Sequence, residues 1–399
     1  MALGTGVGGL GNYFYHLLMG RMLGPVDYGI LASLISLSYL LSIPTGTLSL
    51  VLVKFVSSFK GKNDFDSIST LFRISSIKTL VPALLFLLLF LICSPFIASF
   101  LHINSIFPFI LVLLTFFVGI FLTINMAFLQ GVLRFGYLSF NSILQVFLKL
   151  LVAVILVIWG FKVNGALFGL LVGSIFGYFF AFVPLRWLFK SPKKELKLGE
   201  IKFFNFALPV FFSTLAFTSL FSMDIVLVRH FLPGQLSGFY AALALLSKII
   251  FFIASPIIAV SFPLISERHA SGNRYFHLLW MSFGLVGVIC LFSTLIYFLF
   301  PAFIIGILYG SQYLSAAPYL GFFAVFLSFY SLSFLMTNFF LSVGKTKIVV
   351  LPVTASLIQI ILISFLHQNL WQIVSISTIL MALLFVGLLI YCLRISWAK

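Results

Sequence analysis

The chain is 399 residues long, and 62% of its residues are hydrophobic while only 8% are charged. This composition excludes a soluble globular protein, whose surface needs far more charge, and it is typical of a membrane protein. The net charge of +16 does not indicate nucleic-acid binding, because basic loops between membrane spans already account for it through orientation and attraction to anionic lipid head groups.

Apolar stretches follow one another along the whole chain. A helix needs about 20 apolar residues to span the hydrocarbon core, and barrel strands are excluded because these stretches are too long and do not alternate. The sequence predicts an all-α integral membrane protein with short connections and twelve spans, at residues 2–20, 28–53, 75–98, 105–128, 142–160, 163–184, 206–229, 237–264, 278–300, 314–341, 347–366 and 370–393.

The first span begins almost at Met1, without the charged region and cleavage site of a signal peptide. Such an abrupt start is typical of a truncated or misassigned N-terminus. The span is rich in glycine and carries Asn12, which fits either close packing against a neighbouring helix or a bendable gate.

The first turn lies within LMGRMLGPVDYGILASL (residues 18–34), where Arg21 and Asp27 flank the pair Gly24 and Pro25. A Gly-Pro pair favours a tight turn, and charges are tolerated there because the membrane rim is wet. We interpret Arg21 either as an interface anchor or as a group that contacts passing cargo.

Basic residues indicate the orientation, because Lys and Arg stay preferentially in the short loops on the cytoplasmic side. The predicted spans place 19 of the 23 basic residues on one side, with Lys149 counted beside the fourth connection. Arg21, Lys162 and Arg229 lie on the other side, and Lys248 falls inside a span. We expect a multi-pass protein of the plasma (inner) membrane with both termini in the cytoplasm.

An internal repeat relates the two halves of the chain. The segment 18–34 aligns with LVRHFLPGQLSGFYAALALL (227–246), pairing Gly29 with Gly238, and Asn125 and Arg134 align further on with Asn338 and Lys347. A near-constant offset with six spans in each half predicts two six-helix lobes related by a pseudo-two-fold axis along the membrane normal. The predicted lobes are residues 1–190, holding helices one to six, and 191–399, holding helices seven to twelve.

Three motifs in order carry a family resemblance: GRMLGPVDYGILASL (20–34), DIVLVRHFLPGQLSGFYAALALLSK (224–248) and ILYGSQYLSAAPYL (307–320). The chain resembles the O-antigen type of polysaccharide flippase, in the multidrug/oligosaccharidyl-lipid/polysaccharide exporter superfamily. It departs from many relatives in having twelve predicted spans rather than fourteen. The resemblance implies a V-shaped cavity between two lobes that opens alternately to either side, with polyprenyl-pyrophosphate-linked oligosaccharides as cargo.

Lys248 is the most informative single residue. It lies about 16 Å into its predicted helix, counted from Ser237 at 1.5 Å per residue, and a lysine at that depth costs at least about 3 kcal/mol unless it meets water or a partner. We therefore expect Lys248 to face a cavity and to hold the pyrophosphate of the cargo; the alternative is a lysine paired with a carboxylate to fix helix packing. Small residues share its helix face, namely Ala241, Ala244, Ser255 and Ala259.

Asp224 is the one acidic residue within a predicted span, and Arg229 follows it. Three readings stay open for Asp224: a salt bridge to Lys248 or Arg229 that breaks as the lobes rock, a proton or sodium site that couples an ion gradient to movement, and a hydrated residue at the outer boundary. We predict Lys248, Arg229 and Arg21 as cargo-binding cations and Asp224 as the coupling site.

Metals, cofactors and catalysis have no support in the sequence. The six histidines show no metal-ligand spacing, and the three cysteines read as small residues of apolar runs. The amides in or near spans are expected to form hydrogen bonds between helices; they are Asn125, Gln145, Asn338 and Gln359.

Three other functions compete with the flippase. A drug:cation antiporter of the same superfamily would favour carboxylates, and the chain has only seven acidic residues. A glycan polymerase or acyltransferase would need a catalytic base and a sizeable outer loop, yet the predicted outer loops are short. A purely structural scaffold leaves Lys248 unexplained. We therefore expect a transporter rather than an enzyme, with membrane lipids around it and H⁺ or Na⁺ as coupling ion.

Overall fold

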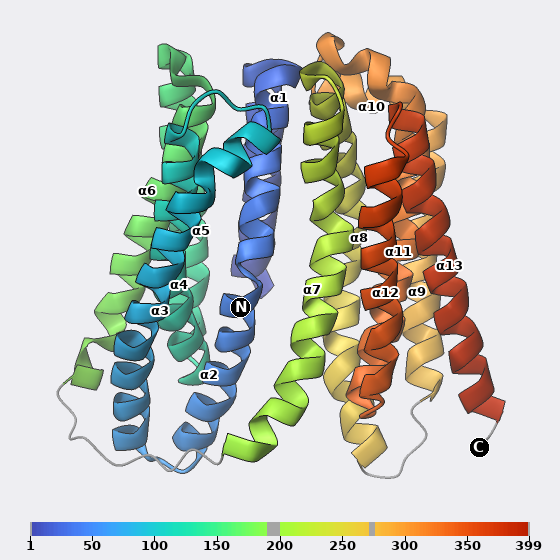
Figure 1. Cartoon of the computed structure of the whole chain (residues 1–399). Helices are drawn as coiled ribbons and strands as arrows, with labels where there is room; N and C mark the ends of the chain where they lie inside the picture. Colours follow the sequence, from blue (N-terminus) through green and yellow to red (C-terminus); the bar gives the residue numbers. More distant parts are fainter. Residues whose placement is uncertain (1, 190–199, 271–275, 398–399) are drawn as a thin grey trace. The chain divides into compact units, whose positions relative to one another are not determined.

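The computed structural model describes residues 2–189, 200–270 and 276–397, and nearly all of them are helical (Figure 1). The described elements are, in chain order, α1 (Ala2–Leu41), α2 (Ile43–Gly61), α3 (Phe65–Phe100), α4 (Phe107–Gly131), α5 (Phe135–Leu156), the π-helix η1 (Val157–Phe161), α6 (Lys162–Phe182), the 3₁₀ helix η2 (Val183–Phe189), α7 (Glu200–Phe231), α8 (Gly234–Ala270), α9 (Phe276–Leu299), α10 (Pro301–Leu308), the 3₁₀ helix η3 (Ser311–Tyr319), α11 (Leu320–Ser342), the 3₁₀ helix η4 (Thr346–Val349), α12 (Val350–Phe365) and α13 (Leu370–Trp397).

Ten stretches of the described residues are long and apolar enough to cross a membrane. Two of them, Gly8–Leu41 and Phe135–Leu188, are broken at Gly24 (φ 71°) and at Gly160 (φ 89°). Each break divides one stretch into two spans, which yields the predicted twelve. The all-α, multi-pass membrane fold is therefore confirmed.

The second span differs from its prediction as one continuous helix. α1 ends at Leu41 and α2 begins at Ile43, with Pro44 in its first turn. Proline has no N–H to donate to the preceding turn, and its ring disfavours a helical residue before it. The chain therefore starts a new helix at this point inside the predicted span.

The chain divides into two compact units. The N-terminal unit comprises Met1–Leu23 and Ser33–Ala207, and the C-terminal unit comprises Gly24–Ala32 and Leu208–Lys399. The lobe boundary predicted between residues 190 and 191 falls outside the described residues. The short segment 24–32, although early in the chain, is part of the C-terminal unit.

In the N-terminal unit, α4 packs against α2, α3 and α6, and α6 also packs against α5. A cluster of buried apolar side chains fills the space between these helices; Phe72 and Phe128, for example, meet edge to face with 4.9 Å between ring centroids. By contrast, α3 leaves large apolar side chains such as Leu85, Leu88 and Phe96 exposed. A helix in this environment is stable because lipid, rather than water, surrounds its outer face.

Polar side chains satisfy the backbone groups at one end of the N-terminal unit. Lys60 donates to the carbonyl of Val132 at 2.6 Å, and Arg134 donates to the carbonyl of Pro184 at 2.9 Å. The last carbonyls of a helix have no partner within it, and cations nearby are favourable. These basic residues therefore stabilise helix ends.

The helices α4 and α11 end in turns of the same kind. In both turns the backbone makes the same three hydrogen bonds, and the central residues, Leu133 and Gly344, have φ of 63° and 77°. This is a Schellman-type end, which uses one left-handed residue. The end of α3 at His102 (φ 52°) makes the same bonds, so the turn is a general way of ending these helices, and the pairing of Arg134 with Lys347 stays a prediction.

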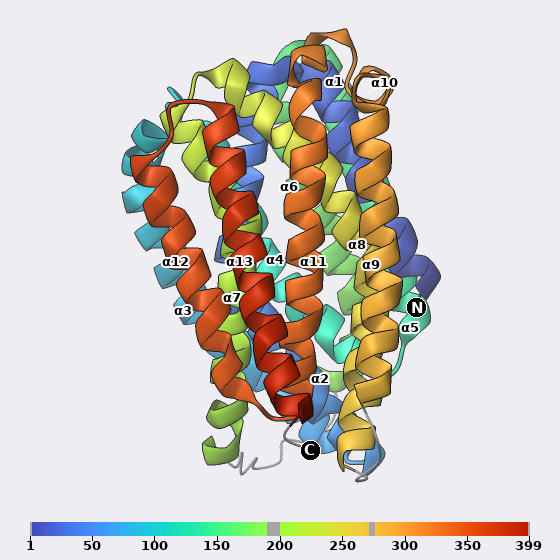
Figure 2. The ribbon, with the colours of Figure 1, turned by 90° about the vertical axis from the view of Figure 1, so that its right-hand side faces the viewer.

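In the C-terminal unit, α11 is the central helix and packs against α8, α9 and α13. Figure 2 shows α11 running between α9 and α13. Aromatic side chains fill this core: the ring centroid of Tyr330 lies 5.5 Å from that of Phe217, 5.3 Å from that of Phe221 and 5.2 Å from that of Phe251. Tyr330 also donates to the carbonyl of Phe217 at 3.2 Å, so the core fixes α7, α8 and α11 together.

Candidate functional site

Asp224 lies inside the C-terminal unit on α7, about two turns before this helix ends at Phe231. Its side chain is only 1% exposed, which rules out the hydrated boundary residue considered from the sequence. The hydroxyl of Tyr240 on α8 donates to its Oδ2 at 2.8 Å, and the backbone N–H of Ile225 donates to Oδ1 at 2.9 Å. A buried carboxylate requires such donors, because desolvation without them is costly.

Lys248 lies on α8, two turns beyond Tyr240, and is 5% exposed. Its Nζ stands 4.0 Å from the ring centroid of Phe221, which precedes Asp224 by one turn on α7, and the charges of Lys248 and Asp224 attract each other. The ring face and the carboxylate partly replace the water that the ammonium has lost. These groups are neighbours of Lys248 within its own unit, and the expectation that Lys248 faces a cavity stays a prediction.

The hydroxyl of Tyr240 is also part of a longer polar chain. A hydrogen bond joins Ser377 of α13 to Tyr240, and the amide of Gln359 on α12 donates to Ser377 Oγ at 3.1 Å. Four helices of the C-terminal unit therefore contribute to one buried network that ends at Asp224. Buried polar networks of this kind hold their members in one arrangement when each is satisfied.

The amides predicted to bond between helices divide into two pairs. Two bond between helices, as expected: Asn125 donates to the carbonyl of Tyr178 on α6, and Gln359 donates to Ser377. The other two bond within their own helices: Asn338 donates to the carbonyl of Phe334, and Gln145 donates to the side chain of Asn141.

Arg229 belongs to a different part of the C-terminal unit. It is 6% exposed, donates from Nη1 to Ser237 Oγ at 3.3 Å, and is attracted by Asp27 of the segment 24–32. Ser237 precedes Lys248 by eleven positions, so Arg229 and Lys248 are separated by roughly 16 Å along α8. The structure therefore does not bring these two predicted cargo cations together.

The segment 24–32 packs tightly onto the start of α8. A Cβ added to Gly238 would lie 1.8 Å from the carbonyl oxygen of Pro25, and one added to Gly29 would lie 2.6 Å from Ser237 Oγ. The hydroxyls of Tyr28 and Tyr309 are 3.3 Å apart, within hydrogen-bonding distance. The two glycines that the repeat aligns are thus in direct contact. Arg21 lies just before this segment, in the N-terminal unit, and its side chain is exposed.

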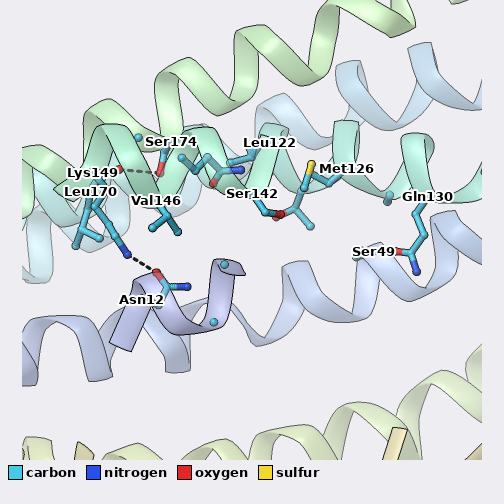
Figure 3. Close-up of a pocket in the computed structure, with 16 residues that line it drawn as sticks. Asn12, Ser49, Leu122, Met126, Gln130, Ser142, Val146, Lys149, Leu170 and Ser174 are labelled. Atoms are coloured by element: carbon cyan, nitrogen blue, oxygen red, sulfur yellow. Dashed lines mark hydrogen bonds between the residues drawn. The ribbon is translucent and has the colours of Figure 1, made fainter. Parts of the chain in front are cut away.

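A pocket of about 500 Å³ lies inside the N-terminal unit (Figure 3). It is lined by residues of α1, α2, α4, α5 and α6, and its volume is within the range of small-molecule sites. Half of the lining residues are polar, which is unusual for an intramembrane surface: they are Asn12, Ser49, Thr123, Gln130, Ser142, Gln145, Lys149 and Ser174.

Lys149 is the one cation among the lining residues, and its side chain is 7% exposed. Its ammonium donates to Oδ1 of Asn12 (Figure 3). It also lies 4.6 Å from the ring centroid of Tyr15. Counting Lys149 with the cytoplasmic loop residues was therefore wrong, because α5 begins at Phe135 and carries it into the membrane interior. The sequence contained the necessary signal, since Lys149 lies within its own predicted span at 142–160.

Glycines on α6 set the position of α5, and so of Lys149. A Cβ on Gly169 would lie 2.6 Å from the carbonyl oxygen of Lys149, and one on Gly173 would lie 2.8 Å from that of Gln145. Small residues spaced four apart let two membrane helices approach closely. With the α5 backbone held against α6, the side chains of Lys149 and Gln145 reach the pocket.

Among the described residues, no group of three or more His, Cys, Asp or Glu side chains is arranged to hold a metal ion. The two arrangements on which a function can be built are therefore the Asp224–Lys248 cluster in the C-terminal unit and the Lys149 pocket in the N-terminal unit. Both place a buried ammonium among polar and aromatic groups inside a membrane protein.

Solved structures with the same fold are transporters. The chain is similar to a multidrug resistance MATE family transporter of the MOP superfamily in an inward-facing conformation, with 13% identity, a TM-score of 0.81, and coverage of 96% of this chain and 94% of the other. It is also similar to the lipid II flippase MurJ, with 15% identity, a TM-score of 0.74, and coverage of 98% of this chain and 87% of the other. The eukaryotic MATE transporter AtDTX14 is similar too, with 14% identity, a TM-score of 0.70, and coverage of 97% of this chain and 93% of the other. At these identities the likeness establishes the fold.

The comparison with curated proteins gives no match to this sequence. A family profile does match: the one described as "Polysaccharide biosynthesis protein" covers residues 18–318, most of the chain. This result agrees with the motifs at 20–34, 224–248 and 307–320, and with the superfamily that they indicated. The chain therefore belongs to the polysaccharide biosynthesis protein family and has the fold of the MOP superfamily.

Proposed function

We propose that the protein is a flippase that moves polyprenyl-pyrophosphate-linked oligosaccharides from the cytoplasmic to the outer leaflet for cell-surface polysaccharide synthesis. The observation that carries the proposal is the buried Lys248 in a member of the polysaccharide biosynthesis family. An intramembrane cation is costly and marks a functional site by default, and a pyrophosphate is the anionic group that such a cargo provides.

Asp224 supplies the coupling in this proposal. While its carboxylate is ionised, it attracts Lys248 and compensates the buried positive charge. When a proton or a sodium ion neutralises Asp224, Lys248 loses that compensation and becomes available to the anionic cargo. Ion binding at Asp224 and cargo binding at Lys248 would then favour each other through one charge pair, which links the ion gradient to the conformational change.

Arg229 and Arg21 have different positions in the proposal. Arg229 is held by Ser237 and Asp27, so it would meet the cargo only at the end of α7, about 16 Å along α8 from Lys248. Arg21 is exposed and lies in the N-terminal unit, just before the segment 24–32. We propose that both act on the cargo after it has left Lys248, as it passes the rim.

The basic residues support a location in the plasma (inner) membrane with both termini in the cytoplasm. Without Lys149, the excess of Lys and Arg residues on the predicted cytoplasmic side is almost unchanged. Lys60 and Arg134, which are counted on that side, lie at helix ends. The positive-inside rule supports this orientation, and transport from the cytoplasmic to the outer leaflet is part of the proposed function.

A drug:cation antiporter is the second candidate, favoured by the structural likeness to MATE transporters and by a buried carboxylate, Asp224, that could hold a cation. The two candidates differ in the charge of the cargo. A cationic drug would be repelled by Lys248 and Lys149, whereas an anionic lipid would be attracted. An enzyme acting on glycans is less well supported, because the described cluster holds its carboxylate in a closed hydrogen-bond network.

The test is reconstitution into proteoliposomes with a fluorescent polyprenyl-pyrophosphate oligosaccharide, measuring how fast the fluorophore becomes accessible to an impermeant quencher. We expect the rate with Lys248→Ala to fall by about two orders of magnitude, a loss of some 3 kcal/mol, while Lys248→Arg retains most of it. Normal flipping by Lys248→Ala would refute the cargo site. Transport of ethidium but not of the lipid would instead establish the antiporter.

A further inference from the structure

Two lysines are buried among the side chains that the structure describes, Lys149 and Lys248, and their surroundings differ. Lys248 is attracted by a carboxylate of its own unit, Asp224. Lys149 lies in a pocket whose lining residues include no Asp or Glu, and its hydrogen-bond partner among the described residues is the neutral amide of Asn12. A buried ammonium without a countercharge is unfavourable, so the pocket is electrostatically suited to an anionic ligand.

The hydroxyls that line the pocket favour a second property of the ligand, in addition to negative charge. Thr123, Ser142 and Ser174 each donate to a carbonyl one turn earlier in their own helices, at 2.7, 3.1 and 3.0 Å. Their protons are therefore already used, and the lone pairs of their oxygens remain to accept hydrogen bonds. A ligand that matches them must bring several hydrogen-bond donors, and the hydroxyls of a sugar ring supply these.

We propose that this pocket binds an anionic sugar of the cargo glycan, with its negative group at Lys149 and its hydroxyls donating to Thr123, Ser142 and Ser174. The inference rests on the proposed function and adds a second, sugar-reading site to it. The negative group can be the carboxylate of a uronic acid or a phosphate ester on the ring, since both offer charged oxygens to an ammonium.

The two sites have different roles in this proposal. The Asp224–Lys248 cluster provides a charge pair that an ion can open, and it carries no sugar specificity. The Lys149 pocket has the volume and the mixture of amides and hydroxyls that recognition of a polar ring requires. Cargo selection therefore belongs to the N-terminal unit and ion coupling to the C-terminal unit.

The test uses the full-length protein in detergent with Cys93, Cys290 and Cys392 replaced and with Ser174→Cys as a reporter in the pocket. Labelling rates are compared for an anionic and a cationic methanethiosulfonate reagent. We expect the anionic reagent to react roughly fivefold faster, as attraction across a few ångströms in water predicts. Lys149→Arg should keep this preference and Lys149→Gln should lose it. A matched reporter, Gln368→Cys at an exposed position, should show no preference for the anionic reagent.

Ligand recognition is then measured as protection of the same cysteine by D-glucuronate, glucose 1-phosphate, glucose and inorganic phosphate. We expect the two anionic sugars to slow labelling, and the better of the two identifies the natural group. The proposal is overturned if both reagents label the cysteine equally, or if neither anionic sugar protects it. It is also overturned if protection survives Lys149→Gln, or if phosphate alone or glucose protects equally well.

The binding test is independent of transport, so the two proposals can fail separately. If the protein flips the lipid in proteoliposomes but no sugar protects the pocket cysteine, the sugar site is overturned and the flippase proposal is unaffected. Protection by anionic sugars in a protein that flips no lipid-linked oligosaccharide would overturn the flippase and leave an anionic-sugar site.

Discussion

At the scale of single residues, the chemistry depends on which partner each buried charge has. Lys248 on α8 and Asp224 on α7 attract each other, and Tyr240 holds the carboxylate with a 2.8 Å hydrogen bond. Removing one member of a buried pair leaves the other uncompensated, which is more harmful than removing both. The pair is therefore best tested as a unit.

We expect Lys248→Met and Asp224→Asn each to lower the free energy of unfolding by about 3 kcal/mol, and the double variant to recover most of that loss. The measurement is thermal or chemical unfolding in detergent. Transport should respond differently, because the double variant has neither the cargo cation nor the coupling carboxylate and should stay inactive. Additive losses of stability would mean that the two charges do not compensate each other.

At the scale of helices, close approach decides where polar side chains can point. α6 carries glycines at four-residue spacing, and Gly169 and Gly173 leave room for the backbone of α5. The same spacing filled with larger residues would push α5 outward and carry Lys149 away from Asn12. The pocket is therefore a product of helix packing as much as of its polar side chains.

We expect Gly169→Leu to destabilise the protein by about 2–3 kcal/mol through overpacking and to abolish the preference of the Ser174→Cys reporter for the anionic reagent. A matched control is Gly287→Leu on α9, where an added Cβ meets nothing within 4 Å. Both variants should insert equally well, since leucine favours the membrane. Unchanged unfolding and labelling in Gly169→Leu would show that the approach of α5 to α6 does not control the pocket.

At the scale of the whole molecule, the segment 24–32 connects the two units through the chain itself. It follows Leu23 and precedes Ser33, both of the N-terminal unit, yet it packs within the C-terminal unit against Gly238 and Ser237. A moving transporter needs such a connection to stay attached while the rest of each unit changes position.

Replacing Gly238 by valine should release this segment, because the added Cβ would overlap the carbonyl of Pro25. We expect hydrogen exchange of the amides of residues 24–32 to become at least about tenfold faster and transport to fall while expression persists. Gly284→Val, at a position with nothing within 4 Å, is the control. Unchanged exchange in Gly238→Val would mean that the segment is held by other contacts, such as Tyr28 with Tyr309.

The sequence by itself determined the membrane class, the twelve spans, the two-fold repeat, the family and Lys248 as a buried cation, because these depend on hydrophobic length, spacing and motifs that local physics sets. Only the tertiary structure decided what each charge contacts: Asp224 with Tyr240, Arg229 with Ser237, and Lys149 with Asn12. Lys149 was missed because it was counted with the loop residues although it lies within the predicted span at 142–160, and the start of α5 at Phe135 showed how far inside its helix it lies. Contacts between helices depend on rotation and close approach, such as the fit of the α6 glycines against α5, and a one-dimensional pattern of hydrophobicity does not contain them.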